Sequence, residues 1–140
     1  MAGFSLGPTM DAIALTIRTA GLTKNAYPYL PKSITPPCVI VNYPRPGEID
    51  YNKTFLHGMY AATFLVDFVV GNVDGLAARD ALSEILDGAT SVAEVLEAKG
   101  SALAAVVDTV DVSDAGIVFL TSDSGAEYLA ARFTVEVAGS

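Results

Sequence analysis

The stretch that decides the fold is Tyr60-Ala-Ala-Thr-Phe-Leu-Val-Asp-Phe-Val-Val70, a run dominated by apolar residues. Its β-branched and aromatic content is typical of a long strand in a sheet. Alternation along a strand gives it two faces, one with Phe64, Val66, Phe68 and Val70 and the other with Thr63, Leu65, Asp67 and Val69. We expect the phenylalanine face to pack against helices.

The residues before this strand predict one helix and one shorter strand. Apolar residues recur at helical spacing from Pro8 to Gly21, and glycine is a natural residue at a helix end. Cys38–Tyr43 has the β-branched composition of a short strand. The segment between them holds four of the seven prolines, so we expect at most one short edge strand there.

The residues after the long strand predict two helices and then further strands. Gly75–Asp87 has an apolar stripe, and the capping box Ser91-Val-Ala-Glu94 opens a shorter helix that ends at Gly100. We expect strands over Ala105–Val112, Ile117–Leu120 and Tyr128–Val137.

This order of elements lacks the regular strand–helix–strand alternation of a parallel sheet. It predicts an α+β fold, with a mainly antiparallel β-sheet flanked on one side by helices. No repeat and no linker interrupts residues 1–140, so we expect a single domain.

Residues 44–58 predict a projecting hairpin or arm. The segment is too long for a tight turn and too rich in aromatic and charged residues for an inert loop. Large apolar groups exposed in such a segment are typical of an interaction surface. We expect a subunit or partner interface here, with the following candidate residues: Tyr43, Arg45, Tyr51, Phe55 and His57.

The composition provides few residues of the types that usually carry out catalysis. Eight Lys plus Arg against sixteen Asp plus Glu give a net charge of −8, which argues against a reader of duplex DNA. The single cysteine excludes an internal disulfide, and the single histidine excludes a multi-His metal site. Phosphate-binding glycine motifs are missing. We therefore expect no catalytic residue, metal or cofactor, and we expect Cys38 to be a small buried hydrophobe.

The sequence also predicts no membrane segment. The run from Met59 to Val73 is interrupted by Thr63 and Asp67, and it is shorter than the roughly 20 apolar residues that a spanning helix needs. The first eight residues lack the basic region and the apolar run of a signal peptide. We expect a soluble protein that is made in the cytoplasm.

Three acidic residues, Asp108, Asp111 and Asp114, invite comparison with a metal cluster. A spacing of three alternates between the two faces of a strand, and the residue order of a calcium loop is missing. A solvated rim is the favoured interpretation.

Asp67 is a carboxylate within an apolar strand, and it must reach water or a partner. Two interpretations stay open: its face lines a subunit interface or a wet lumen, or it is an ordinary polar sheet face in bulk water. The same alternatives hold for Arg132 and Glu136, which alternate with apolar residues in the last predicted strand.

Taken in order, these segments resemble the tail terminator proteins of long-tailed (siphovirus-like) bacteriophages. The matching segments are the opening helix with its glycine, the proline-rich segment before Val39-Ile-Val41, the aromatic arm with Tyr51 and Phe55, Gly75-Leu-Ala-Ala-Arg-Asp-Ala-Leu82, Ser91-Val-Ala-Glu-Val-Leu-Glu-Ala98 and Glu127-Tyr-Leu-Ala-Ala-Arg-Phe-Thr-Val-Glu-Val137. The resemblance spans nearly the whole chain, and the order of the segments carries it.

The resemblance implies a structural virion protein and no enzymatic activity. Such a protein forms a homohexameric ring on the head-proximal end of the tail tube, ends tube polymerisation and presents a surface for head–tail joining. The implied partners are other copies of the chain, the tail tube protein and a head-completion or connector protein, while genomic DNA passes through without specific binding. The implied location is the virion tail, after assembly in the host cytoplasm.

Three other functions compete with this one, of which the third is an adaptor domain of a cellular complex. The first is another neck component, a head-completion or connector protein, which also forms rings. The second is a small-ligand binding module or minor enzyme with a pocket between sheet and helices, which would use Asp67 or His57 as its polar group.

Overall fold

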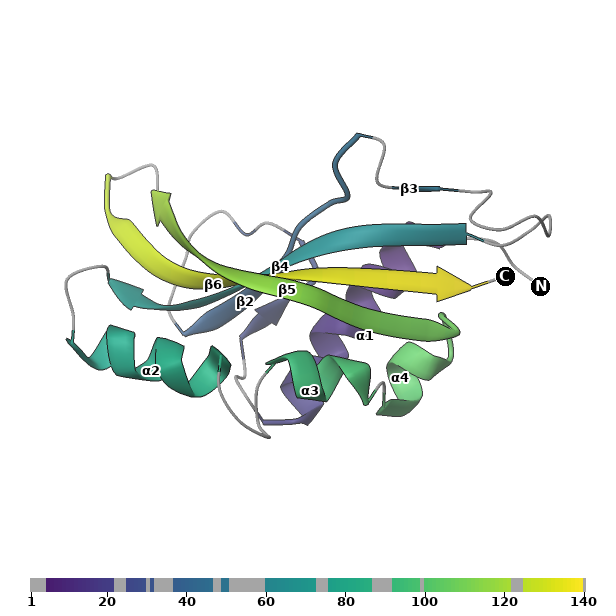
Figure 1. Cartoon of the computed structure of the whole chain (residues 1–140), viewed down its shortest axis with the longest axis horizontal. Coiled ribbons are helices and arrows are strands. Elements are labelled where there is room, and N and C mark those ends of the chain that lie inside the picture. The colour runs from purple at the N-terminus through teal and green to yellow at the C-terminus, as the bar shows by residue number, and fades with distance from the viewer. Residues whose placement is uncertain are drawn as a thin grey trace.

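The computed structural model describes residues 5–21, 25–29, 31, 37–46, 49–50, 60–72, 76–86, 92–98, 100–121 and 125–139. Its elements, labelled in Figure 1, are α1 (Leu6–Thr19), β1 (Ala26–Tyr27), β2 (Cys38–Val41), β3 (Ile49–Asp50), β4 (Tyr60–Asn72), α2 (Leu76–Leu86), α3 (Val92–Glu97), α4 (Gly100–Ala104), β5 (Thr109–Thr121) and β6 (Glu127–Gly139).

The strands of this part of the chain form one sheet in the order β1-β2-β4-β6-β5, and β3 pairs with β4 beside the path. Strand β1 is parallel to β2, and every other pairing is antiparallel. Figure 1 shows the long strands β4, β5 and β6 crossing the molecule, with α2, α3 and α4 beneath them. The predicted α+β class, with a mainly antiparallel sheet and helices on one side, is confirmed.

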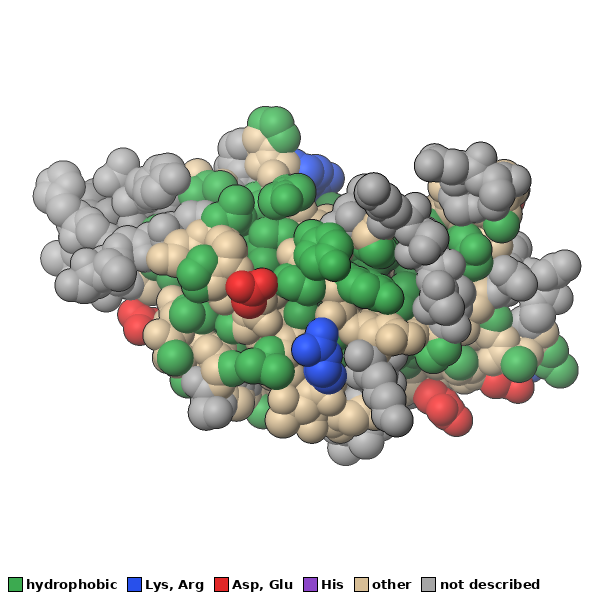
Figure 2. Space-filling view, turned by 180° about the vertical axis from the view of Figure 1, so that it is seen from behind, with side chains coloured by type: hydrophobic (Ala, Val, Ile, Leu, Met, Phe, Trp, Pro, Cys, Tyr) green, Lys and Arg blue, Asp and Glu red, His purple; other side chains and the backbone are tan. Residues whose placement is uncertain are grey.

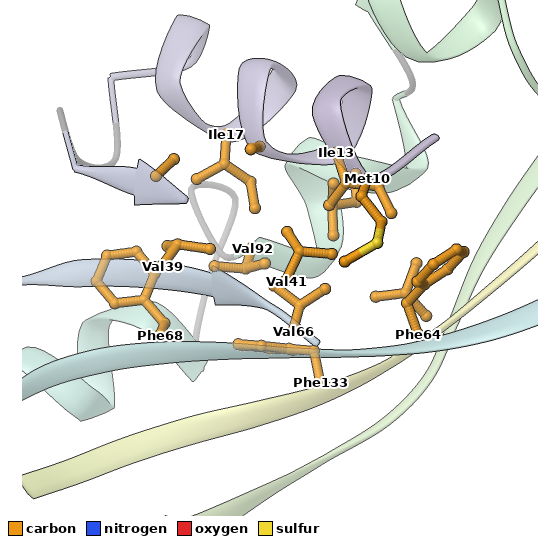
Figure 3. Close-up of a cluster of buried hydrophobic side chains, with 14 of the residues drawn as sticks. Met10, Ile13, Ile17, Val39, Val41, Phe64, Val66, Phe68, Val92 and Phe133 are labelled. Atoms are coloured by element: carbon orange, nitrogen blue, oxygen red, sulfur yellow. The ribbon is translucent and has the colours of Figure 1, made fainter. Parts of the chain in front are cut away.

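The main core lies between the helices and one face of the sheet. Phe64, Val66 and Phe68 are buried there, as the alternation in β4 predicted. Helix α1 supplies Met10, Ile13 and Ile17, which point at β2 and β4 in Figure 3. Burial of a large apolar side chain stabilises a fold by roughly 1.5–3 kcal/mol, so this face holds the helices on the sheet.

The end of α1 is tied to the sheet by its last turn. Gly21 has a φ of 82°, a left-handed conformation that glycine adopts without strain, and its N–H donates to the carbonyl of Arg18. The Arg18 guanidinium donates to the carbonyl of Ala26 in β1 over 2.7 Å. The predicted stop at Gly21 is confirmed, and the described residues of the proline-rich segment include one short edge strand, β1, as predicted.

The chain between α3 and β6 differs from the prediction. Residues 105–108 are not a strand, because Leu103 of α4 and Val107 turn into the main core as the chain leaves a helix that the prediction lacked. The two strands expected over 105–112 and 117–120 are one strand, β5, which follows β6 along its whole length. A β-bulge between Val112 and Asp114 accommodates the shift in register between the two halves of β5.

Candidate functional site

The sheet face away from the main core carries a second, smaller apolar cluster and a polar network. Cys38, Ile40, Val69 and Ala130 form the centre of this cluster, and all of them are buried. Cys38 is fully buried, which confirms that it is a core residue. The polar network lies beside the cluster, where Asp67 of β4 faces Arg132 of β6.

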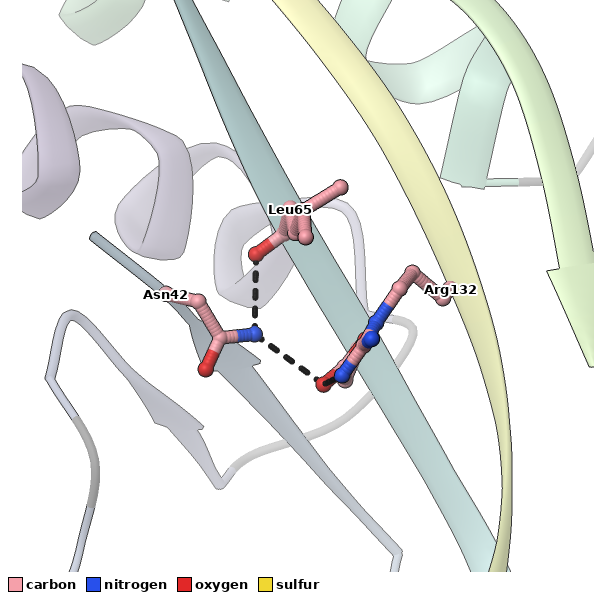
Figure 4. Close-up of polar contacts among 4 residues, drawn as sticks. Asn42, Leu65 and Arg132 are labelled. Carbon is pink, nitrogen blue, oxygen red and sulfur yellow. Dashed lines mark hydrogen bonds and ion pairs between the residues drawn. The ribbon is translucent and has the colours of Figure 1, made fainter. Parts of the chain in front are cut away.

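Asp67 receives three hydrogen bonds. Arg132 donates from Nε to Oδ1 over 2.7 Å and from Nη2 to Oδ2 over 2.9 Å, which is the bidentate geometry of a strong ion pair. Asn42 donates from Nδ2 to the same Oδ2 over 3.0 Å and also to the carbonyl of Leu65 over 3.0 Å. Figure 4 shows Asn42, which follows β2, and Arg132 on β6 pointing toward each other across β4.

Within this network the Asp67 side chain is nearly inaccessible to water, whereas the Arg132 side chain is partly exposed. Asp67 is 2% exposed, whereas the side chain of Arg132 is 35% exposed. The hydrogen bond with Asp67 raises the pKa of Arg132 above its usual value, against the opposing effect of partial burial. A guanidinium charged at every ordinary pH locks β4 to β6 at this register.

The geometry around Asp67 bears on both interpretations of its sheet face. In the single chain the carboxylate lies on the predicted face but meets neither bulk water nor a lumen, because it is buried and bonded within the chain. A subunit interface over this face stays a prediction. Arg132 and Glu136 are half-buried on the same face, and Arg132 lies directly across from Asp67 in the neighbouring strand. The sequence alone missed Asn42, since only the pairing of β2 with β4 brings it to Asp67.

The acidic residues of β5 are exposed, as a solvated rim requires, but their faces were predicted wrongly. Asp111 pairs with Glu136 and Asp114 pairs with Thr134, so both acids lie on the face of Glu136. The bulge inserts one extra residue between Asp111 and Asp114, so both side chains lie on the same face of the sheet. The described residues nevertheless contain no group of three or more His, Cys, Asp or Glu side chains that could hold a metal ion.

The predicted arm is described only in part. Tyr43, Pro44, Arg45 and Pro46 follow β2, and Figure 1 shows this segment rising away from the sheet toward β3. Tyr43 is 61% exposed, and Arg45 is exposed beside it. Tyr51, Phe55 and His57 lie outside the described residues, so their part in an interface stays a prediction.

Two shallow hollows occur on the helical side of the described structure. One of about 340 Å³ lies between α1, α3 and α4, and its described lining residues, among them Leu15, Thr19, Val95 and Ala98, are all uncharged. The other, of about 270 Å³, lies beside α2, and Glu84 is the one charged residue in the described part of its lining. The described lining of neither hollow holds the pair of titratable groups that acid–base chemistry requires.

Large apolar side chains are also exposed outside these hollows. Ile117 and Phe119 of β5 are 56% and 61% exposed, and the sequence analysis did not single them out. Figure 2 shows the back of the molecule, where hydrophobic side chains spread widely between a few separate charged groups. Apolar surface of this kind on an acidic chain favours contact with other proteins.

The sequence matches no protein-family profile, and a search of curated proteins finds no significant match. In the described part of the chain, none of the helices has the length and apolar character needed to cross a membrane.

Proposed function

We propose that this chain is a structural virion protein that forms a ring on the head-proximal end of a phage tail tube. The ring ends tube polymerisation and offers a surface for head–tail joining. The observation that carries the proposal is the segment after β2, where exposed Tyr43 and Arg45 stand on a stretch that rises from the sheet. A projecting aromatic and basic segment on a rigid sheet is suited to contact with a neighbouring subunit.

The rigidity of the sheet at that point supports the same proposal. Asn42, the residue before Tyr43, is fixed by three hydrogen bonds: its N–H and its side chain both donate to Leu65, and its side chain also donates to Asp67. The base of the projecting segment is therefore held by the Asp67–Arg132 network. A fixed base lowers the entropy that a contact segment loses on binding.

The charge of the chain fits a conduit for DNA. Six copies would carry 6 × −8 = −48, and a ring of that charge repels a duplex instead of gripping it. A cyclic ring also uses one pair of complementary patches per subunit and closes on itself, so it ends growth where an open filament would continue.

The proposal is tested by mass measurement, electron microscopy and a tube-length assay. Six copies of the 14.5 kDa chain give 6 × 14.5 = 87 kDa, and we expect six-fold rings, alone or on tube ends. Purified protein added to polymerising tail tube subunits should shorten the tubes. Binding to portal-bearing heads without any effect on tubes would identify a head-completion protein and overturn the proposal.

The contact segment is tested with a matched pair of variants. The double variant Tyr43→Ser with Arg45→Ser should stay folded and should bind tube ends at least tenfold more weakly. The control is Tyr29→Ser, because Tyr29 is also an exposed tyrosine but stands outside the projecting segment. Equal capping by both variants would remove the segment from the proposed interface.

A further inference from the structure

Strand β5 ends the sheet on one side, and its two halves differ in how their outer edge is protected. Within the described residues β5 (Thr109–Thr121) pairs only with β6, so its other edge has no strand partner there. An open strand edge is a template for pairing with another chain, and proteins normally block it with charges, bulges or cover.

The first half of β5 has such protection. Asp111 and Asp114 are exposed charges, and the bulge between Val112 and Asp114 breaks the regular edge. The carboxylate of Glu97 in α3 accepts a hydrogen bond from the Val112 N–H over 3.2 Å, which occupies an edge donor. A second chain could not pair here without displacing these groups.

The second half, Ala115–Thr121, has none of these protective features. Its sequence Ala-Gly-Ile-Val-Phe-Leu-Thr contains no charged residue and no proline, and its pairing with β6 runs without a register shift. Ile117 and Phe119 stand 56% and 61% exposed on it. Seven uncharged residues, among them Ile117, Val118, Phe119 and Thr121 of high β propensity, form an edge that favours pairing.

We propose that Ala115–Thr121 pairs with the same segment of a second copy of this chain, antiparallel, with a two-fold axis at Val118. In this register each Ile117 faces the Phe119 of the other copy, and each Gly116 faces a Leu120. Pairs of aromatic and β-branched residues are among the favourable cross-strand pairs, and a glycine leaves room for a leucine. The segment is thus complementary to itself, as an isologous contact requires.

The self-complementary register favours a second copy as the occupant, and the charge of the chain permits it at this segment. Each chain carries −8, so two copies repel each other wherever acidic surfaces meet. The segment Ala115–Thr121 brings no charge to the contact, and two copies can meet there without placing acids opposite each other. This dimer closes on itself and is separate from the proposed ring, so either assembly can be found without the other.

Mass photometry and sedimentation equilibrium test the contact. Two copies give 2 × 14.5 = 29 kDa, and we expect a concentration-dependent dimer of that mass. The double variant Ile117→Lys with Phe119→Lys should dissociate at least tenfold more readily, and Leu15→Lys on α1, where Leu15 is 45% exposed, should not. Mixing the lysine variant with an Ile117→Glu, Phe119→Glu variant should restore the dimer, because each introduced lysine then faces a glutamate.

Disulfide trapping tests the register. Val118→Cys lies on the axis and should cross-link to itself under mild oxidation, whereas Thr121→Cys alone and Ala115→Cys alone should not. A mixture of these last two should cross-link, because residues 115 and 121 face each other in the proposed pairing. The native Cys38 is fully buried, so the unsubstituted chain serves as the control.

A chain that stays monomeric at high concentration, or a dimer that the lysine variant leaves intact, would overturn the proposal. Cross-linking of Thr121→Cys alone, or none by Val118→Cys in a dimer, would overturn the register. Circular dichroism of each variant separates loss of pairing from loss of folding. A ring without a dimer contradicts only this proposal, and a dimer without rings, either free or on tube ends, contradicts only the proposed function.

Discussion

Gly139 at the end of β6 stands directly opposite Tyr60 at the start of β4, and the tyrosine ring covers the glycine. A Cβ at residue 139 would lie 2.8 Å from Oη of Tyr60 and 3.1 Å from its Cε1 and Cζ. The ring is held in that place because its hydroxyl donates to the carbonyl of Val106 over 3.1 Å. The pair therefore fastens the end of the sheet to the turn after α4.

Gly139→Ala should destabilise the fold. The new methyl group would push the buried ring away from Val106, and overpacking of this kind costs about 1–3 kcal/mol in the free energy of unfolding. Urea denaturation of dilute protein measures the change. The control is Gly116→Ala, because a Cβ there meets nothing within 4 Å. Equal effects of the two substitutions would show that the close approach to Tyr60 is unimportant.

Tyr60 should make stability fall in alkaline solution. Burial raises the pKa of its hydroxyl above the ordinary value of 10.0, and the negative charge of Asp108 raises it further. A raised pKa in the folded state gives a stabilisation that is complete below about pH 10 and is lost as the pH rises through the folded value.

Tyr60→Phe should therefore cost about 1 kcal/mol at neutral pH, through the lost hydrogen bond to Val106. The same variant should weaken the dependence of the free energy of unfolding on pH above pH 10. Denaturation curves between pH 8 and 11.5 (about the range in which tyrosines titrate) measure both effects. An unchanged alkaline slope would assign the pH dependence to other groups.

The Asp67–Arg132 pair should respond unequally to loss of either partner. Arg132→Leu leaves a carboxylate that is only 2% exposed with Asn42 as its remaining donor, and we expect a loss of about 3 kcal/mol. Asp67→Leu leaves an arginine whose side chain is 35% exposed and can reach water, so a smaller loss of about 1–2 kcal/mol is expected.

The double variant completes the cycle for this pair. With both charges removed, the loss should be smaller than the sum of the two single losses by at least about 1 kcal/mol, because no unpaired charge stays buried. Thermal or urea unfolding of the four proteins gives the coupling. Additive losses would mean that the two side chains stabilise the sheet independently.

The attachment of α1 to the sheet should depend on its buried side alone. Ile17→Ala removes a fully buried side chain from the main core and should cost about 3 kcal/mol. Leu15→Ala on the same helix, where the side chain is 45% exposed, should change stability by about 0.5 kcal/mol or less. Similar losses at both positions would contradict the observed orientation of the helix.

Local patterns predicted most of the fold because they depend on neighbours along the chain. The alternation in β4 identified the face of Phe64 and Phe68 correctly, and helical spacing identified the stripe on α1. The candidate site was less predictable: the sequence pointed to Asp67 and Arg132 separately, whereas their pairing depends on the register between strands 65 residues apart. Asn42 was not predicted because its contact with Asp67 depends on the pairing of β2 with β4.

The single strand β5 shows a second limit of local patterns. Gly116 and the acids before it resemble a break, yet the strand continues because β6 supplies a hydrogen-bonding partner along its whole length. Helix α4 was missed because five residues are too few for a periodic pattern, and burial of Leu103 holds them in place.

The sequence by itself determined the class of the fold, the buried faces of α1 and β4 and the acidity of the chain, since periodicity and composition are local properties. Tertiary structure alone decided which side chains meet across the sheet, that the bulge places Asp111 and Asp114 on one face, and that Ala115–Thr121 lies on an outer edge. Strand order and register decide these features, because contacts between distant segments form only when the whole sheet packs against its helices.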